Sequence, residues 1–371
     1  MCGAFLHDID LAIELEKRGH DVVFMSLEVP KVGVNGGDYR GFKYMHFSAG
    51  AKYLDVSEGW ICPHAPALPE VRKLNARGYN RPILATCHYD GNYNAIIRNN
   101  PGRKIQWVEM MMFINSIMEP NYKKNVDPWP PNVVRTAVVR PLMHENKIKI
   151  DEEFRGDCIT LVNANQNKGV AQFIAMARHM PDRKFLGVIP YYGELRLPEA
   201  PDNIEWIPFD DDIRNILKRT RLLVLPSYYE SFGRIAVEAM YNGIPVLYSK
   251  PVAKPKYPGG STEGVESWIK PAGIACDREK IEEWAYAIAN LDSEETYTAR
   301  SALVRQHIQN MNLFTEGARI AGLVEQFVRD YPVKIQTPQQ QQAQQPQQTS
   351  AKIVQPAGRV GFSNGRLRIQ R

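Results

Sequence analysis

The sequence reads Leu222-Leu-Val-Leu-Pro-Ser-Tyr-Tyr-Glu-Ser-Phe-Gly-Arg-Ile-Ala-Val-Glu-Ala-Met-Tyr-Asn-Gly-Ile-Pro-Val-Leu247 in its second half, and this stretch sets the architecture. Apolar residues predict a buried strand over 222–225, which a polar loop follows. A helix is predicted to begin near Gly233 and to end at Gly243, because glycine is typical of the position just after a helix. The run 244–248 predicts another strand, and this order is typical of an α/β layer with a parallel sheet.

The same alternation extends through most of the chain. In the second half, further strands are predicted at 158–162, 184–189, 204–206 and 221–225, with helices at 170–179, 212–219 and 234–242. In the first half, a helix over 8–18 and a strand over 21–26 precede apolar runs at 60–62, 83–87, 106–108 and 137–139. We therefore expect two α/β domains, 1–150 and 151–331, joined near 145–156, with a last helix that could cross back.

The residues after 331 have a different composition. Residues 332–358 are rich in glutamine, and such a segment cannot bury enough apolar surface to offset the entropy of ordering it. We predict a flexible linker there, followed by a short basic tail over 359–371.

Composition and charge indicate a soluble globular protein, with 44% hydrophobic and 23% charged residues and a net charge of +5. No apolar run approaches the roughly 20 residues of a membrane-spanning helix, and the first residues do not resemble a secretory signal. The five cysteines are odd in number and form no C-x-x-C pair, so free thiols are expected. The expected location is the cytoplasm.

The loop and helix after Leu225 are suited to binding an anionic ligand. Backbone N–H groups at a helix start lack partners within the helix, and the helix dipole favours an anion such as a diphosphate there. Glu238 lies on the first turns of this helix, near enough to accept hydrogen bonds from the ribose hydroxyls of a nucleotide. Glu230 lies in the loop itself.

Glu230 and Glu238 form an E-x7-E arrangement within Pro-Ser-x-x-Glu-Ser-Phe-Gly, and this motif resembles the signature of retaining glycosyltransferases, especially glycosyltransferase family 4. The resemblance implies the GT-B fold, in which two Rossmann-like parallel-sheet domains face a cleft, here with a disordered C-terminal tail. The alternative is a plain strand and helix with solvated carboxylates. That alternative explains the alternation of elements but leaves Glu-Ser-Phe-Gly unexplained.

The resemblance also assigns roles to residues. Glu238 would bind the ribose and Glu230 would lie beside the transferred sugar. Backbone groups facing the sugar and the diphosphate would come from Ser231, Phe232, Gly233 and Arg234. The family needs no bound metal and no cofactor besides the nucleotide-sugar donor.

A basic pair of the family, Arg and then Lys five residues later, is only half present. Lys168 matches the lysine, whereas Asn163 occupies the arginine position. This departure removes one cation from a site that must stabilise charge on the leaving phosphate. Either another cation such as Arg234 substitutes for it, or turnover is slow. Lys168 could otherwise be a solvated lysine at a helix start.

In the first domain, Pro82-Ile-Leu-Ala-Thr-Cys-His-Tyr-Asp90 is similar to the family's Thr-x-His segment. His88 would end a parallel strand, where ligands bind in such sheets, and would approach the donor sugar. Ile114-Asn-Ser116 resembles a further element at the cleft edge. The family's opening strand and glycine loop should precede Asp10, so we expect the first domain to lack its first strand.

Two other patterns are interpreted as structural. Asp210-Asp211-Asp212 contains a D-x-D, but it directly precedes a predicted helix and is expected to cap it. The glycine-rich run 254–260 lacks the strand before it and the helix after it that a phosphate-binding loop requires.

The sequence therefore predicts transfer of a sugar from a nucleoside diphosphate sugar to an acceptor hydroxyl with retention, through Glu230, His88 and Lys168. Two alternatives stay open: a catalytically weak GT-B-like binding protein, and an enzyme acting on modified bases of a nucleic acid. The second would use attraction between phosphates and the tail arginines Arg359, Arg366, Arg368 and Arg371. An epimerase or phosphorylase fits Glu-Ser-Phe-Gly poorly. The acceptor, the sugar and the base are not identified.

Overall fold

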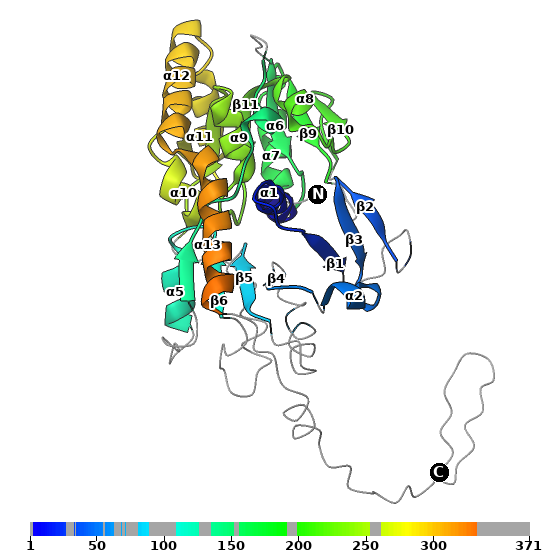
Figure 1. The fold of residues 1–371 in the computed structure, drawn as a ribbon. Coiled ribbons are helices and arrows are strands. Elements are labelled where there is room, and N and C mark those ends of the chain that lie inside the picture. Colours follow the sequence, from blue (N-terminus) through cyan, green and yellow to red (C-terminus); the bar gives the residue numbers. More distant parts are fainter. Residues whose placement is uncertain are drawn as a thin grey trace, which may run out of the picture. The chain divides into compact units, whose positions relative to one another are not determined.

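The structure is a computed structural model, and it describes residues 3–26, 33, 35–54, 56–62, 68, 71, 81–88, 109–125, 135–151, 156–190, 199–252 and 261–331. Within these residues the strands form three sheets, of six, four and three strands (Figure 1). The strand 106–108, the loop 254–260, the Gln-rich segment and the basic tail of the sequence analysis lie outside the described residues.

The six-stranded sheet has the order β10-β9-β8-β11-β12-β13, and all its neighbouring strands are parallel. Its strands are β8 (Cys158–Val162), β9 (Phe185–Val188), β10 (Ile204–Ile207), β11 (Thr220–Leu225), β12 (Val246–Ser249) and β13 (Ile274–Cys276). Its helices are α7 (Val170–His179), α8 (Ile213–Leu217), α9 (Arg234–Tyr241), α10 (Glu263–Ile269), α11 (Ile281–Ala289) and α12 (Glu294–Asn310). Successive residues such as Leu223 and Val224 are both buried, because helices cover both faces of a parallel sheet.

The four-stranded sheet is also parallel, with the order β4-β5-β6-β7. Its strands are β4 (Trp60–Cys62), β5 (Ile83–Cys87), β6 (Met110–Phe113) and β7 (Arg135–Val138). In the three-stranded sheet, β1 (Val23–Ser26) pairs in parallel with β3 (Phe42–His46), and β2 (Gly37–Tyr39) is antiparallel to β3. The other elements of this half are α1 (Gly3–Lys17), η1 (Phe47–Gly50), α2 (Ala51–Leu54), α5 (Met118–Asn125) and α6 (Glu145–Ile148).

The two parallel sheets confirm the α/β architecture expected from the sequence. Helix α7 has its predicted bounds, and the predicted strands at 60–62, 83–87 and 158–162 match β4, β5 and β8. Helix α1 begins at Gly3 rather than at residue 8, so His7 is helical. Strands β2, β3, β6 and β13 were not predicted; β2, for example, consists of three exposed residues, Gly-Asp-Tyr, and has no apolar run.

After the six-stranded sheet, the chain continues through η4 (Leu313–Thr315) into α13 (Glu316–Asp330), which packs against α1 (Figure 1). Arg18 Nη2 lies 2.6 Å from Glu325 Oε2, and Arg135 Nη1 lies 2.6 Å from Asp330 Oδ2. Helix α13 therefore contacts elements that precede the six-stranded sheet in sequence.

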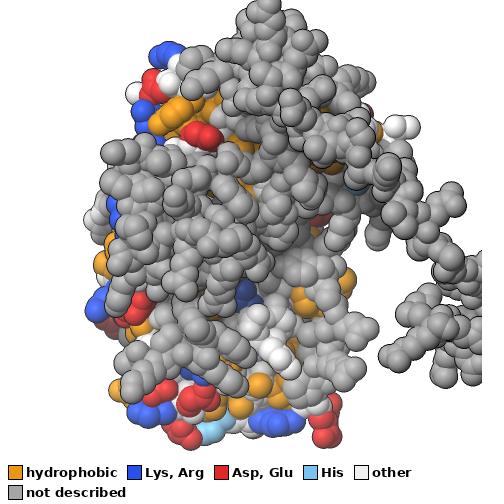
Figure 2. Space-filling view, turned by 90° about the horizontal axis from the view of Figure 1, so that it is seen from below, with side chains coloured by type: hydrophobic (Ala, Val, Ile, Leu, Met, Phe, Trp, Pro, Cys, Tyr) orange, Lys and Arg blue, Asp and Glu red, His pale blue; other side chains and the backbone are white. Residues whose placement is uncertain are grey.

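Among the described residues, no helix is long and apolar enough to cross a membrane. On the face shown in Figure 2, the described Lys and Arg side chains lie next to Asp and Glu side chains. The charge that is visible there is therefore of mixed sign.

Candidate functional site

The loop between β11 and α9 is held in place by helix α10. Trp268 Nε1 donates to the Phe232 carbonyl at 2.7 Å, and the two rings stack with centroids 5.3 Å apart. A Cβ atom on Gly264 would lie 2.0 Å from the Ser231 carbonyl oxygen, so α10 approaches the loop backbone directly. Gly233 precedes α9 with φ of +74°, a conformation that glycine adopts without strain.

The backbone carbonyls of this loop face protein donors. Asn115 Nδ2 donates to the Ser231 carbonyl at 2.6 Å, and Val265 N–H donates to the Glu230 carbonyl at 3.3 Å. By contrast, no hydrogen bond among the described residues takes the N–H groups of 231–234. The N–H groups of loop residues 231–233 and of Arg234, the first residue of α9, are therefore donors without an acceptor among the described residues, and such donors suit an anion.

Lys168 and Glu230 meet in a largely buried ion pair. Lys168 Nζ lies 2.7 Å from Glu230 Oε2 and also contacts Oε1; the two side chains are 25% and 7% exposed. Close loop packing brings the two residues together, since a Cβ atom on Gly169 would lie 2.0 Å from the Pro226 carbonyl oxygen. The loops that follow β8 and β11 therefore unite two predicted catalytic residues.

Asn163, at the position where the family has arginine, has a left-handed backbone conformation with φ of +63°. Asparagine is among the few residues that tolerate this conformation at low cost. Its Oδ1 accepts a hydrogen bond from Asn165 Nδ2 at 3.3 Å. The loop backbone is thus one reason why asparagine fits here better than a long basic side chain.

Arg234 and Glu238 belong to a second buried ionic cluster, which Asp10 completes. Arg234 Nε donates to Glu238 Oε1 and Arg234 Nη2 to Asp10 Oδ2, both at 2.9 Å, and Nη1 donates to the Leu142 carbonyl at 2.6 Å. Burial lowers the pKa of Arg234, but the two carboxylates outweigh burial and raise it. Burial raises the pKa of Glu238, and Arg234 opposes that effect. The guanidinium of Arg234 is therefore engaged by protein groups and is not a free substitute for the missing arginine.

His88 lies at the end of β5 against helix α1. Its Nε2 is 3.4 Å from Asp8 Oδ1, and its ring meets that of His7 edge to face at 5.3 Å. The fully buried His7 accepts at Nδ1 from the Leu142 N–H at 3.0 Å, which places its ring proton on Nε2. Burial, and then the nearby charges of His88 and Arg234, lower the pKa of His7 well below 6.5, so the ring is neutral.

Three residues that take part in these contacts were not predicted from the sequence: Asp10, His7 and Trp268. The available signal for Asp10 was a carboxylate within an apolar run, since Ile9, Leu11 and Ala12 beside it are buried. Asn115 belongs to the predicted cleft-edge segment; its Oδ1 accepts from the N–H groups of residues 117 and 118, while its Nδ2 donates to the Ser231 carbonyl.

Asp212 accepts from the Arg214 N–H at 3.1 Å, which confirms the predicted helix cap. Among the described residues, no group of three or more His, Cys, Asp or Glu could hold a metal ion.

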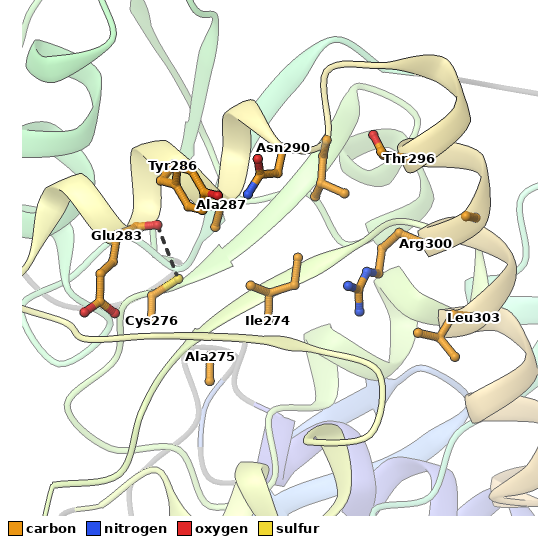
Figure 3. A pocket seen from close by; sticks show the side chains of 12 residues that line it. Ile274, Ala275, Cys276, Glu283, Tyr286, Ala287, Asn290, Thr296, Arg300 and Leu303 are labelled. Atoms are coloured by element: carbon orange, nitrogen blue, oxygen red, sulfur yellow. Dashed lines mark hydrogen bonds between the residues drawn. The ribbon is translucent and has the colours of Figure 1, made fainter.

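A pocket of about 610 Å³ lies elsewhere, between β13, α11 and α12. Figure 3 shows Arg300 pointing from α12 toward Ile274, with Tyr286 on the facing helix and the contact between Cys276 and Glu283 dashed. None of the predicted site residues lines this pocket.

Sequence comparison places similarity in the second half of the chain. Residues 195–307 match the family described as Glycosyl transferases group 1. Over 116 residues, the chain is 30% identical to a D-inositol 3-phosphate glycosyltransferase of Rhodococcus opacus (strain B4), covering 31% of this chain and 22% of that protein. An enzyme of the same name from Corynebacterium kroppenstedtii is 24% identical over 123 residues, or 33% of this chain and 25% of that protein. The matched stretch thus spans a quarter of these relatives or less.

Similarity to solved structures extends over most of the chain. Sucrose-phosphate synthase from Thermosynechococcus elongatus superposes with a TM-score of 0.66 at 13% identity, covering 88% of this chain and 93% of that one. Anabaena HepE, solved in complex with UDP and glucose, gives 0.65 at 16% identity, covering 87% and 96%. These likenesses confirm the expected GT-B fold.

Proposed function

We propose that this chain, which has the GT-B fold and matches the family described as Glycosyl transferases group 1 over residues 195–307, transfers a sugar from a nucleoside diphosphate sugar to an acceptor hydroxyl with retention. The observation that carries the proposal is the set of backbone N–H groups at 231–234, which have no protein acceptor among the described residues and flank the Lys168–Glu230 pair. Unsatisfied donors beside a lysine suit a diphosphate.

In the proposed reaction, the bond between the anomeric carbon and the diphosphate oxygen breaks. The acceptor oxygen forms its bond on the same face of the sugar, and the acceptor proton passes to the departing diphosphate. Lys168 and the N–H groups of 231–234 stabilise the negative charge that develops on the leaving group. Glu230, released from Lys168 by the arriving diphosphate, accepts hydrogen bonds from the sugar hydroxyls. Glu238 accepts from the ribose.

A second candidate function is nucleotide-sugar binding with little turnover. Two observations favour it: Asn163 supplies no positive charge, and Lys168 is already neutralised by Glu230. Release of free nucleoside diphosphate from a bound donor separates the two functions, because a binding protein retains affinity without releasing product. Action on a nucleic acid through the tail stays a prediction.

Titration calorimetry with UDP, GDP and ADP tests the donor site. We expect one of them to bind, and Glu238→Ala to weaken it by about tenfold or more, because a hydrogen bond to a charged group contributes about 1.5–3 kcal/mol. Glu282→Ala, which removes an exposed carboxylate from α11, is the matched control and should leave binding unchanged. Failure of all three nucleotides to bind, or unchanged binding in Glu238→Ala, contradicts the proposal.

Turnover is then measured by mass spectrometry of products after incubation with mixed nucleotide sugars and candidate acceptors. A mass increase of one sugar on one acceptor, lost in Lys168→Ala, is the expected result. Nucleotide binding without any product favours the binding protein.

A further inference from the structure

Asp10 on α1 lies between buried apolar residues of the helix, but its side chain contacts cations. It is 1% exposed, yet both its oxygens are used: Oδ2 accepts from Arg234 Nη2 at 2.9 Å and Oδ1 from Lys147 Nζ at 2.8 Å. A buried carboxylate is costly unless it is paired and hydrogen-bonded, and Asp10 is both. Two cations from separate parts of the chain thus converge on one residue of helix α1.

Arg234 lies between Asp10 and Glu238 and donates a hydrogen bond to each of them. The guanidinium is planar, and its Nε–H and Nη2–H form one side of a fork that can hold a carboxylate with two parallel hydrogen bonds. Here that side is divided between two carboxylates, since Nε–H bonds to Glu238 and Nη2–H bonds to Asp10. Arg234 therefore engages Glu238 through Oε1 alone.

We propose that Asp10 is a positioning residue that, through Arg234, keeps one oxygen of Glu238 available to the ribose and so sets the preference for ribonucleotides over deoxyribonucleotides. This inference rests on the proposed function. Without Asp10, Nη2–H is free to join Nε–H, and both oxygens of Glu238 become engaged by the fork. The ribose hydroxyls then lose their acceptor, whereas the N–H groups of 231–234 and Lys168 still hold the diphosphate.

The test compares ligands that differ in the ribose. Calorimetry measures the affinity of wild type and Asp10→Ala for whichever of UDP, GDP and ADP binds best, for its 2′-deoxy and 3′-deoxy counterparts, and for inorganic diphosphate. We expect wild type to prefer the ribonucleotide by about tenfold or more, as for a hydrogen bond to a charged group. In Asp10→Ala this ratio falls toward one, and the affinity for inorganic diphosphate stays within about twofold.

Two further variants sharpen the test. Asp10→Asn keeps an oxygen that can accept from Nη2–H, so it should restore part of the ribose preference and serves as the measured variant if Asp10→Ala does not fold. Asp292→Ala is the matched control, because it removes a carboxylate from a pair with Arg183 that is exposed at both ends.

The outcomes separate the two proposals. If wild type binds no nucleoside diphosphate, the proposed function fails. If wild type distinguishes ribose from deoxyribose and Asp10→Ala retains the full ratio, the role of Asp10 is wrong while the proposed function stands. An equal loss of affinity for every ligand, inorganic diphosphate included, shows a merely structural role and also overturns the inference. A ratio that is unchanged in both Asp10→Asn and Asp10→Ala likewise contradicts the positioning role of Asp10.

Discussion

Substituting the two members of the Lys168–Glu230 pair should change the affinity for a nucleoside diphosphate in opposite directions. Glu230→Gln removes a negative charge beside the predicted diphosphate site and releases Lys168, so nucleoside diphosphate binding should become tighter. Lys168→Met removes the cation and leaves Glu230, 7% exposed, without its partner, so binding should weaken and the protein should lose stability. Transfer activity should fall in both variants, because each removes a group that acts in the reaction.

The magnitude follows from Coulomb's law. A carboxylate about 6 Å from one phosphate charge is repelled by about 3 kcal/mol at an effective dielectric constant of about 20, and Lys168 cancels most of this in wild type. A net gain of about 1–2 kcal/mol, or about 5–30-fold in affinity, is expected for Glu230→Gln. Breaking a buried pair costs about 3–5 kcal/mol of stability, and because Lys168 is 25% exposed we expect about 2–3 kcal/mol for Lys168→Met.

Calorimetry with the best-binding nucleoside diphosphate measures the affinities, and urea unfolding measures the stabilities. A double-mutant cycle with Glu230→Gln and Lys168→Met then isolates the interaction between the pair. If both single variants weaken binding to the same extent, or if neither changes it, the diphosphate does not compete with Glu230 for Lys168 and the reasoning is refuted.

Gly169→Ala should lower stability by several kcal/mol, because its φ is +78° and the new Cβ would lie 2.0 Å from the Pro226 carbonyl oxygen. Gly322→Ala, in open space on α13, should raise stability by about 0.5–1 kcal/mol. Melting temperatures of the two variants check both predictions. The free energy of unfolding should fall as the pH drops below 6.5. Burial lowers the pKa of His7 in the native protein, so in this range the unfolded chain binds a proton at His7 and the native protein does not. His7→Gln should flatten that slope in urea titrations at successive pH values, and a slope unchanged by it contradicts the assignment. Asn163→Arg should tighten diphosphate binding, because it adds a positive charge. It should also lower the stability of the protein by about 1 kcal/mol, because residue 163 has a left-handed backbone conformation. If calorimetry shows no gain in affinity, the diphosphate does not bind beside residue 163.

Much of the candidate site could be predicted because it lies within one short stretch. Glu230, Gly233 and Glu238 are spaced by a loop and a helix start, and these local elements follow from the order of apolar and polar residues. The partners of these residues could not be predicted in the same way. Lys168 lies 62 residues before Glu230, and their contact depends on how closely the loops after β8 and β11 pack.

Local periodicity and turn residues thus predicted the alternating α/β elements and the start of α9 near Gly233, because each depends on neighbours within one or two turns of chain. Tertiary packing alone could establish that Asp10 and Arg234, 224 residues apart, form one buried ionic cluster with Glu238. The spacing of apolar residues in a helix does not show whether a charged side chain among them faces water or another charged side chain. Only the packing of α1 against the start of α9 removes the water and makes that pairing necessary.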